Sequence, residues 1–369
     1  MVHHHAPKKG QSLIARGVSM KKGILKIIKI LSITTLIVTF LIIITGFVVF
    51  ISNPVLRFML VMNEIVPAWG VSSQEVVLPL ENNKKTKMTI YQPVFAKPDA
   101  YYFCVHGLTP QGYTHPSMVK LAKALALATR RKVLVPYLFG SETDRDIIDA
   151  TKEIKSMYLA ARKLYPGKYN GFGACIAATM LVAALKDMPA SLYPHKIFMY
   201  GPFLNGEMLM HFYNTSGMDV DFIVKLANAI RHPKLTQEEK NLVGKAIAAT
   251  KPGVTDKALM KHILGQDLYT KIDSLKIENP EFKQINEMTL FDTSKPLPQC
   301  KYYILHSRQD NIIPYSMGMS MHKYLLQLGL KSTFVATGAF QHTQQGRSYK
   351  TLKAEFNEIY AFFDDLFKE

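Results

Sequence analysis

Residues 169–178 read Tyr-Asn-Gly-Phe-Gly-Ala-Cys-Ile-Ala-Ala, and they are the most informative stretch of the chain. Within it, Gly173, Cys175 and Ala177 follow the pattern small, any, nucleophile, any, small, with cysteine at the nucleophile position. A nucleophile on a sharp turn between a strand and a helix needs small residues two positions to either side, because otherwise the turn cannot close. A run rich in Ala, Leu and Met follows and favours a helix over residues 177–186. The pattern therefore predicts that the Cys175 side chain stands clear of a sheet at a strand-to-helix turn.

The same stretch has a second possible register. If residues 171–175 formed the turn, the nucleophile position would hold Gly173 and the protein would be inactive as an enzyme. That register puts the bulky Ile176 where the helix must pack closely on the sheet, whereas the first register puts Ala177 there. Close packing favours the first register, with Cys175 at the turn.

Two residues further along the chain complete a candidate triad. Asp310 follows a strand-like run, and His342 lies in the loop after the next strand-like run. Along the chain, the nucleophile comes first, then the acid and then the histidine. A known enzyme fold has its catalytic triad in this order. His306 is a competing histidine, but its position at the end of the strand before the acid favours a structural role. The sequence thus predicts a triad of Cys175, Asp310 and His342.

The elements around these residues alternate between strands and helices, which is typical of a mostly parallel sheet. Strands are expected over residues 74–80, 87–92, 101–105, 133–136, 168–172, 196–200, 301–305 and 332–336. Helices are expected over residues 116–130, 144–164, 177–186, 219–230, 237–249, 256–265 and 316–330.

The chain resembles the α/β-hydrolases. The resemblance rests on four motifs: the His106-Gly107 strand end, the turn at Cys175, the Asp310 loop and the turn that ends at His342. The resemblance covers roughly residues 76–204 and 298–369. Residues 105–140 are also similar to hydrolases of monoacylglycerol-lipase and esterase type. The resemblance implies an α/β-hydrolase fold, a mostly parallel sheet flanked by helices, with residues 205–297 as a helical cap insertion.

The resemblance also implies an activity, the hydrolysis of a carboxylic ester, with an acyl ester or lipid as substrate. In this interpretation an acyl group is carried on Cys175, and the backbone N–H groups of Leu108 and Ile176 form the oxyanion hole. An acyltransferase that uses the same triad is the alternative, and a catalytically inactive binding protein with the same fold is another. No cofactor is expected, and the histidines show no metal-ligand spacing.

Two departures from the family pattern bear on this interpretation. The nucleophile is cysteine, as in dienelactone hydrolases and polyhydroxyalkanoate synthases, so the substrate class stays open. Ala177-Ala178 replaces the usual Gly-Gly, which keeps the residues small. Cys104 and Cys300 lie in or beside strand-like runs and are expected to fill space. The odd number of cysteines implies no disulfide framework.

Near the N-terminus, residues 31–51 form a run of 21 residues without a charge. About 20 apolar residues cross the hydrocarbon core of a bilayer, so the run predicts a single transmembrane helix. A cleavable signal peptide is the alternative, but no Ala-x-Ala-like site follows. Residues 1–30 carry seven Lys or Arg and no Asp or Glu, so this tail is expected to stay in the cytoplasm. The catalytic domain is then expected on the periplasmic, extracytoplasmic or lumenal side.

Residues 52–75 are expected to form a juxtamembrane segment. Its residues 54–70 are too apolar for a solvated linker and end near Trp69, the only tryptophan. We expect an interfacial helix on the lipid, with packing on the domain itself as the alternative. The formal net charge of +17 favours a position near anionic headgroups, and no basic-aromatic motif indicates nucleic acid as a partner. The sequence makes no prediction about oligomeric state.

Overall fold

The structure is a computed structural model in which residues 10–80, 84–107, 111–138, 147–186, 188–204, 206–215, 225–226, 229–230, 232, 234–249, 257–274, 296–310, 312–338 and 353–368 are described. The chain divides into two compact units, Met1–Asn53 and Pro54–Glu369.

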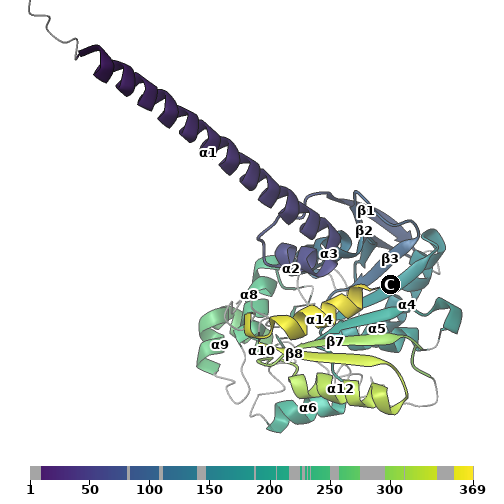
Figure 1. Cartoon of the computed structure of the whole chain (residues 1–369). Helices are drawn as coiled ribbons and strands as arrows, with labels where there is room; N and C mark the ends of the chain where they lie inside the picture. The colour runs from purple at the N-terminus through teal and green to yellow at the C-terminus, as the bar shows by residue number, and fades with distance from the viewer. Residues whose placement is uncertain are drawn as a thin grey trace, which may run out of the picture. The chain divides into compact units, whose positions relative to one another are not determined.

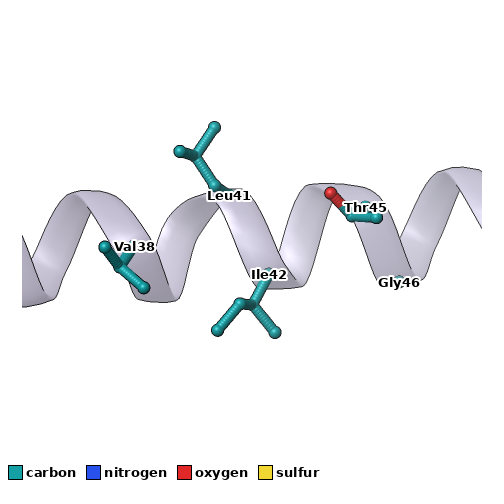
Figure 2. Close-up of a pocket in the computed structure, with 5 residues that line it drawn as sticks. All are labelled: Val38, Leu41, Ile42, Thr45 and Gly46. Atoms are coloured by element: carbon teal, nitrogen blue, oxygen red, sulfur yellow. The ribbon is translucent and has the colours of Figure 1, made fainter.

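The first unit contains one long helix, α1 (Gly10–Ser52). Its residues Ile28–Ser52 are long and apolar enough to cross a membrane, and none of that apolar window is buried. Figure 2 shows part of this helix, with the side chains of Val38, Leu41 and Ile42 projecting from it. Its length and composition fit a membrane anchor and a signal sequence alike.

The second unit is built on an eight-stranded sheet with the order β1-β2-β4-β3-β5-β6-β7-β8 (Figure 1). The strands are β1 (Val71–Pro79), β2 (Lys85–Pro93), β3 (Ala100–Val105), β4 (Lys132–Pro136), β5 (Lys168–Ala174), β6 (Lys196–Tyr200), β7 (Lys301–Ser307) and β8 (Ser332–Thr337). Strands β3 to β8 run parallel, whereas β2 pairs in antiparallel fashion with both of its neighbours, β1 and β4. All eight predicted strands are therefore present, with ends that shift by at most three residues.

Helices cover both faces of the sheet, because parallel strands need crossover connections that pass over a face. The helices are α2 (Pro54–Met62), α3 (Pro116–Thr129), α4 (Ile147–Leu164), α5 (Ile176–Leu185), α6 (Gly206–Thr215), α8 (Gln237–Ala249), α9 (Lys257–Leu264), α10 (Gln266–Asp273), α12 (Tyr315–Gln327) and α14 (Phe356–Phe367), with 3-10 turns η2 (Gly112–Thr114) and η3 (Ala190–Leu192). One apolar core lies between the sheet and α4, α5 and α12. A second lies on the opposite face, under α2, α3 and α14.

The position of α2 corrects the expectation of a helix on the lipid. Val55 and Phe58 are buried among the side chains of α3 and α14, and the Phe58 ring lies 4.5 Å from the Phe363 ring. The Arg57 guanidinium donates to the backbone oxygens of Leu127, at 3.1 Å, and Ala128, at 2.6 Å. The apolar character of α2 is therefore explained by packing on the domain.

The insertion between β6 and β7 has an apolar core of its own. Helices α8, α9 and α10 pack together around Val243, Met260 and Leu268. The predicted helices over 237–249 and 256–265 are present, and α10 was not predicted. Most of the predicted helix over 219–230 lies outside the described residues.

Candidate active site

Cys175 lies between the last residue of β5 and the first residue of α5. Its backbone has φ 58° and ψ −137°, a conformation that non-glycine residues rarely adopt. Its N–H donates to the Tyr200 carbonyl at 2.7 Å, which joins the turn to the neighbouring strand β6. The turn therefore falls at Cys175, while Gly173 lies inside the strand, paired with Val105 of β3 and Met199 of β6.

The geometry explains why the residues around the turn are small. A Cβ atom added to Gly173 would lie 2.5 Å from the Cα of Ala178 and 2.9 Å from the oxygen of Ala177. A Cβ on Gly107 would lie 3.1 Å from the Cβ of Cys175. The helix thus crosses close over the strand, and the end of β3 approaches the turn from its other side. Both close approaches depend on the absence of a side chain.

Asp310 lies just after β7 and is buried. Its Oδ1 accepts hydrogen bonds from the backbone N–H of Ile312, at 3.0 Å, and of Ile313, at 2.9 Å. Its Oδ2 lies 3.4 Å from Nε2 of His306. Because β7 and β5 are both parallel strands with β6 between them, Asp310 and Cys175 emerge at the same carboxyl edge of the sheet.

His306 is fully buried, and its Nε2 lies 2.7 Å from the Ile313 carbonyl oxygen. A Cβ on Gly318 would lie 2.4 Å from its Nδ1, so α12 covers the ring closely. These contacts hold the loop of Asp310 against β7.

Two of the predicted site residues, His342 and Leu108, lie outside the described residues. The described residues that flank His342 are held near each other. The Glu355 carboxylate accepts hydrogen bonds from the Thr337 hydroxyl, at 2.6 Å, and from the Gly338 N–H, at 3.0 Å. Ile176 begins α5, and within the described residues no side chain caps that helix, so its amide end faces the turn.

Sequence reasoning did not single out the ring of His106, which precedes Gly107 at the end of β3. The Leu138 N–H donates to its Nε2 at 3.3 Å, so the other ring nitrogen carries the proton and contacts the Gly107 oxygen at 2.9 Å. Burial lowers the pKa of His106 to about 4. A neutral imidazole therefore connects β3 to the end of β4. The histidine at the strand end was the only available signal.

Tyr200 is a second residue that sequence reasoning missed. It ends β6, between the strands that lead to Cys175 and Asp310. Burial raises the pKa of its phenol, and the Asp310 carboxylate and Cys175 raise it further. Tyr200 therefore stays neutral beside the two candidate catalytic residues.

An apolar cluster lies directly beside the turn. Its buried members are Phe203, Leu209, Ile313 and Met317. Cys175 and Ile176 pack against it, and so does Phe212 of α6. The cluster joins the end of β6, the first helix of the insertion and the loop of Asp310, so the surroundings of the cysteine are apolar on this side. Among the described residues, no three His, Cys, Asp or Glu side chains are grouped as metal ligands would be.

The fold of this chain is similar to that of solved structures. Over 81% of this chain and 87% of the other, the structure is similar to carboxyl esterase 2 from the mycorrhizal fungus Tuber melanosporum, with a TM-score of 0.51 and 12% identity. It is also similar to the acylaminoacyl peptidase of Pyrococcus horikoshii, with a TM-score of 0.50 and 12% identity over 84% of this chain and 42% of that chain. The chain has the α/β-hydrolase fold. No protein-family model matches the sequence, and no curated protein matches it either.

Proposed function

We propose that this protein is a carboxylic ester hydrolase that works through an acyl thioester on Cys175. The observation that carries the proposal is the backbone of Cys175, a non-glycine residue at φ 58° between β5 and α5. Such strain persists only where the surrounding structure enforces it, and it often marks a functional site. One of the similar structures is a carboxyl esterase, which supports ester hydrolysis as the reaction.

In the proposed mechanism, His342 takes the proton from the Cys175 thiol, and the sulfur attacks the ester carbonyl carbon. The Ile176 and Leu108 N–H groups bind the oxyanion that forms. The carbon–oxygen bond to the alcohol then breaks, and His342 returns the proton to the leaving alcohol. Water attacks the thioester with His342 as base, which releases the carboxylic acid and restores the thiol. Asp310 orients the imidazole of His342 and stabilises its charged form.

The insertion is proposed to cover this site. Gln111, just after the loop that contains Leu108, donates through Nε2 to the Asn241 side-chain oxygen of α8 at 3.0 Å. Leu209 and Phe212 of α6 belong to or pack on the apolar cluster beside Cys175. We propose that this cluster receives the acyl chain, with residues 205–297 as the cap and residues 76–204 and 298–369 as the catalytic core.

We also propose where the protein is located in the cell, on the basis of helix α1. Residues 31–51 are proposed to span the membrane once, with residues 1–30 in the cytoplasm and the catalytic domain on the other side. The seven Lys or Arg residues before Leu31 support this orientation. Protease treatment of intact spheroplasts tests it: digestion of a C-terminal tag together with protection of an N-terminal tag is expected, and the reverse would overturn it.

The catalytic proposal is tested with the detergent-solubilised full chain and p-nitrophenyl esters of increasing acyl length. Cys175→Ala is expected to lose nearly all hydrolysis with an unchanged fold by circular dichroism, because the acyl acceptor atom is gone. Cys175→Ser is expected to keep part of it, since an alkoxide in the same geometry attacks the same carbon. Full activity of Cys175→Ala would show that the nucleophile lies elsewhere.

The other two cysteines serve as internal controls in a labelling experiment. Burial raises the pKa of the Cys104 thiol well above its usual value and that of Cys300 to about 12. Thiolates react and thiols do not, so both should resist iodoacetamide. We expect label at Cys175, mapped by peptide mass spectrometry, and loss of hydrolysis in proportion to that label. Labelling of Cys104 or Cys300 in preference to Cys175 would contradict the proposal.

A further inference from the structure

We propose that the amino-terminal edge of the parallel sheet docks on an anionic bilayer, so that the candidate catalytic edge faces the water. The amino-terminal edge is the one at which strands β3 to β8 begin, opposite to Cys175 and Asp310. Three observations on the Pro54–Glu369 unit place a membrane-binding surface there. The docking inference rests on the proposed membrane anchor, which brings a bilayer close to the domain. Its consequence for the substrate also rests on the proposed esterase activity.

The first observation is an exposed apolar patch of Trp69, Val94 and Phe95, which we call the edge patch. The exposed fractions of these side chains are 78%, 71% and 79%. The Val94 N–H donates to the Gly70 oxygen at 2.7 Å, which brings the turn after β2 beside the residue that follows Trp69. Tryptophan and other aromatic side chains are favoured at the level of the lipid headgroups.

The register of the sheet locates the edge patch. Strand β2 runs antiparallel to β4, with Tyr91 opposite Val133, so the residues after Pro93 extend past the beginning of β4. The Lys97 N–H donates to the Arg130 oxygen at 2.6 Å, just before β4. The edge patch therefore lies at the amino-terminal edge of the sheet.

The second observation is a row of cations at the same edge. Strands β4, β5, β6 and β7 each begin with a lysine, and a lysine directly precedes β8. With the neighbouring residues the row comprises Lys97, Arg130, Arg131, Lys132, Lys168, Lys196, Lys301 and Lys331. Of the described carboxylates near them, Asp365 pairs with Lys301 and Asp364 pairs with Lys368, while Asp99 lies before β3. The Lys196 ammonium donates to the backbone oxygens of Asp365, at 3.2 Å, and Leu366, at 3.0 Å, so the other cations of the row are the ones offered to the lipid. Cations exceed carboxylates at this edge, as binding to anionic headgroups requires.

The third observation is the place at which the chain enters the domain. Arg57, three residues after Pro54, contacts the carbonyl oxygens at the end of α3, and α3 leads directly into β4 at Lys132. The segment that follows α1 therefore joins the domain at the amino-terminal edge. Only α2 and a short loop separate it from Trp69.

The consequence concerns the substrate. A seven-residue strand such as β5 spans about 20 Å, so Cys175 stands roughly that far from the docked edge. An acyl chain that stays in the same bilayer cannot bridge this distance to the sulfur. The substrate class would then be an ester that arrives through the water or projects far from the membrane, rather than a phospholipid of the anchoring leaflet.

The orientation is tested with the intrinsic fluorescence of Trp69, the only tryptophan, in the full chain reconstituted into nanodiscs that contain phosphatidylglycerol. Brominated lipids are expected to quench most of the Trp69 emission. The matched probe is Trp69→Phe combined with Val77→Trp. Val77 is also exposed, at 61%, but it lies near the opposite end of the β1–β2 pair, opposite Lys87. Its emission should be little quenched. Quenching of both probes alike, or of the Val77→Trp probe alone, would overturn the proposed orientation.

Two further measurements separate the contributions of charge and of apolar contact to the docking of the edge patch on the bilayer. Val94→Asp should weaken the quenching of Trp69, whereas the control Val77→Asp should leave it unchanged. Raising the salt from 0.1 M to 1 M shortens the screening length from about 10 Å to about 3 Å, so it should weaken quenching as well. Equal effects of the two substitutions would contradict an edge-specific surface. Failure of the full chain to enter nanodiscs would overturn the anchor and the docking together.

The substrate consequence is tested with short-chain and long-chain p-nitrophenyl esters in micelles and in nanodiscs. The ratio of long-chain to short-chain hydrolysis should fall by roughly tenfold in nanodiscs, a factor that corresponds to about 1.4 kcal/mol. An unchanged ratio would overturn the substrate inference. If neither ester is hydrolysed in micelles, the proposed esterase fails, while the fluorescence of Trp69 still decides the docking.

Discussion

At the scale of single residues, the turn at Cys175 depends on the missing side chain of Gly173. Gly173→Ala would place a Cβ atom 2.5 Å from backbone of α5, so the helix or the strand must shift. We expect a loss of about 1–3 kcal/mol in the free energy of unfolding and a large loss of hydrolysis. The matched control is Gly171→Ala, whose Cβ would meet only the side chains of Leu181 and Ile197, at 3.2 Å and 3.4 Å. A denaturant series on both variants measures the difference, and equal losses would contradict this account of the turn.

His106 makes a second residue-scale prediction, on pH. Its pKa in the folded protein is about 4, against an ordinary value of 6.5, because burial disfavours the charged ring. Below pH 6.5 the unfolded chain therefore takes up a proton that the folded chain does not. The stabilising contribution is complete above pH 6.5 and is lost as the pH falls towards 4, by about 3 kcal/mol in total.

Thermal unfolding in mild detergent between pH 7 and pH 4 measures this dependence. His106→Gln keeps a donor and an acceptor without the titration, so its unfolding temperature should fall less steeply with acid. The pKa values of His115, His195 and His322 are also lowered by burial, and these residues keep part of the slope in both proteins. An identical slope in the variant would show that His106 does not set the acid sensitivity.

At the scale of elements, α2 is held on the domain by an apolar face and one buried cation. Burial and the nearby Arg130 lower the pKa of the Arg57 guanidinium, which nevertheless donates to two carbonyls at the end of α3. Arg57→Met leaves these carbonyls without their donors, at an expected cost of about 1–3 kcal/mol. Lys163→Met, at the exposed end of α4, is the control and should stay within about 0.5 kcal/mol. A similar unfolding midpoint for both variants in urea would argue against this role for Arg57.

At the scale of the whole molecule, the division of the chain predicts where it can be shortened. The compact unit begins at Pro54, so removal of residues 1–53 should leave its unfolding temperature and its ester hydrolysis close to those of the full chain. Removal of residues 1–62 also deletes Val55, Phe58 and Val61, which are buried in the core beneath α3 and α14. This longer deletion should destabilise the domain by several kcal/mol, since each buried apolar side chain contributes about 1.5–3 kcal/mol. Calorimetry on both proteins tests the boundary, and equal stability would place α2 outside the domain.

The eight strands, the parallel sheet and the turn at Cys175 could be predicted from the sequence, because hydrophobic period and small residues act over a few positions of the chain. The sequence also pointed to Asp310, whose loop directly follows a recognisable strand. The prediction that α2 lies on the lipid was wrong, because an apolar helix has the same sequence pattern whether lipid or protein covers it. Likewise, the neutral ring of His106, the Arg57 contacts and the lysine edge opposite Cys175 join residues that are far apart in sequence. These features become visible once the chain is folded, because burial and strand register are set by partners that no local pattern specifies.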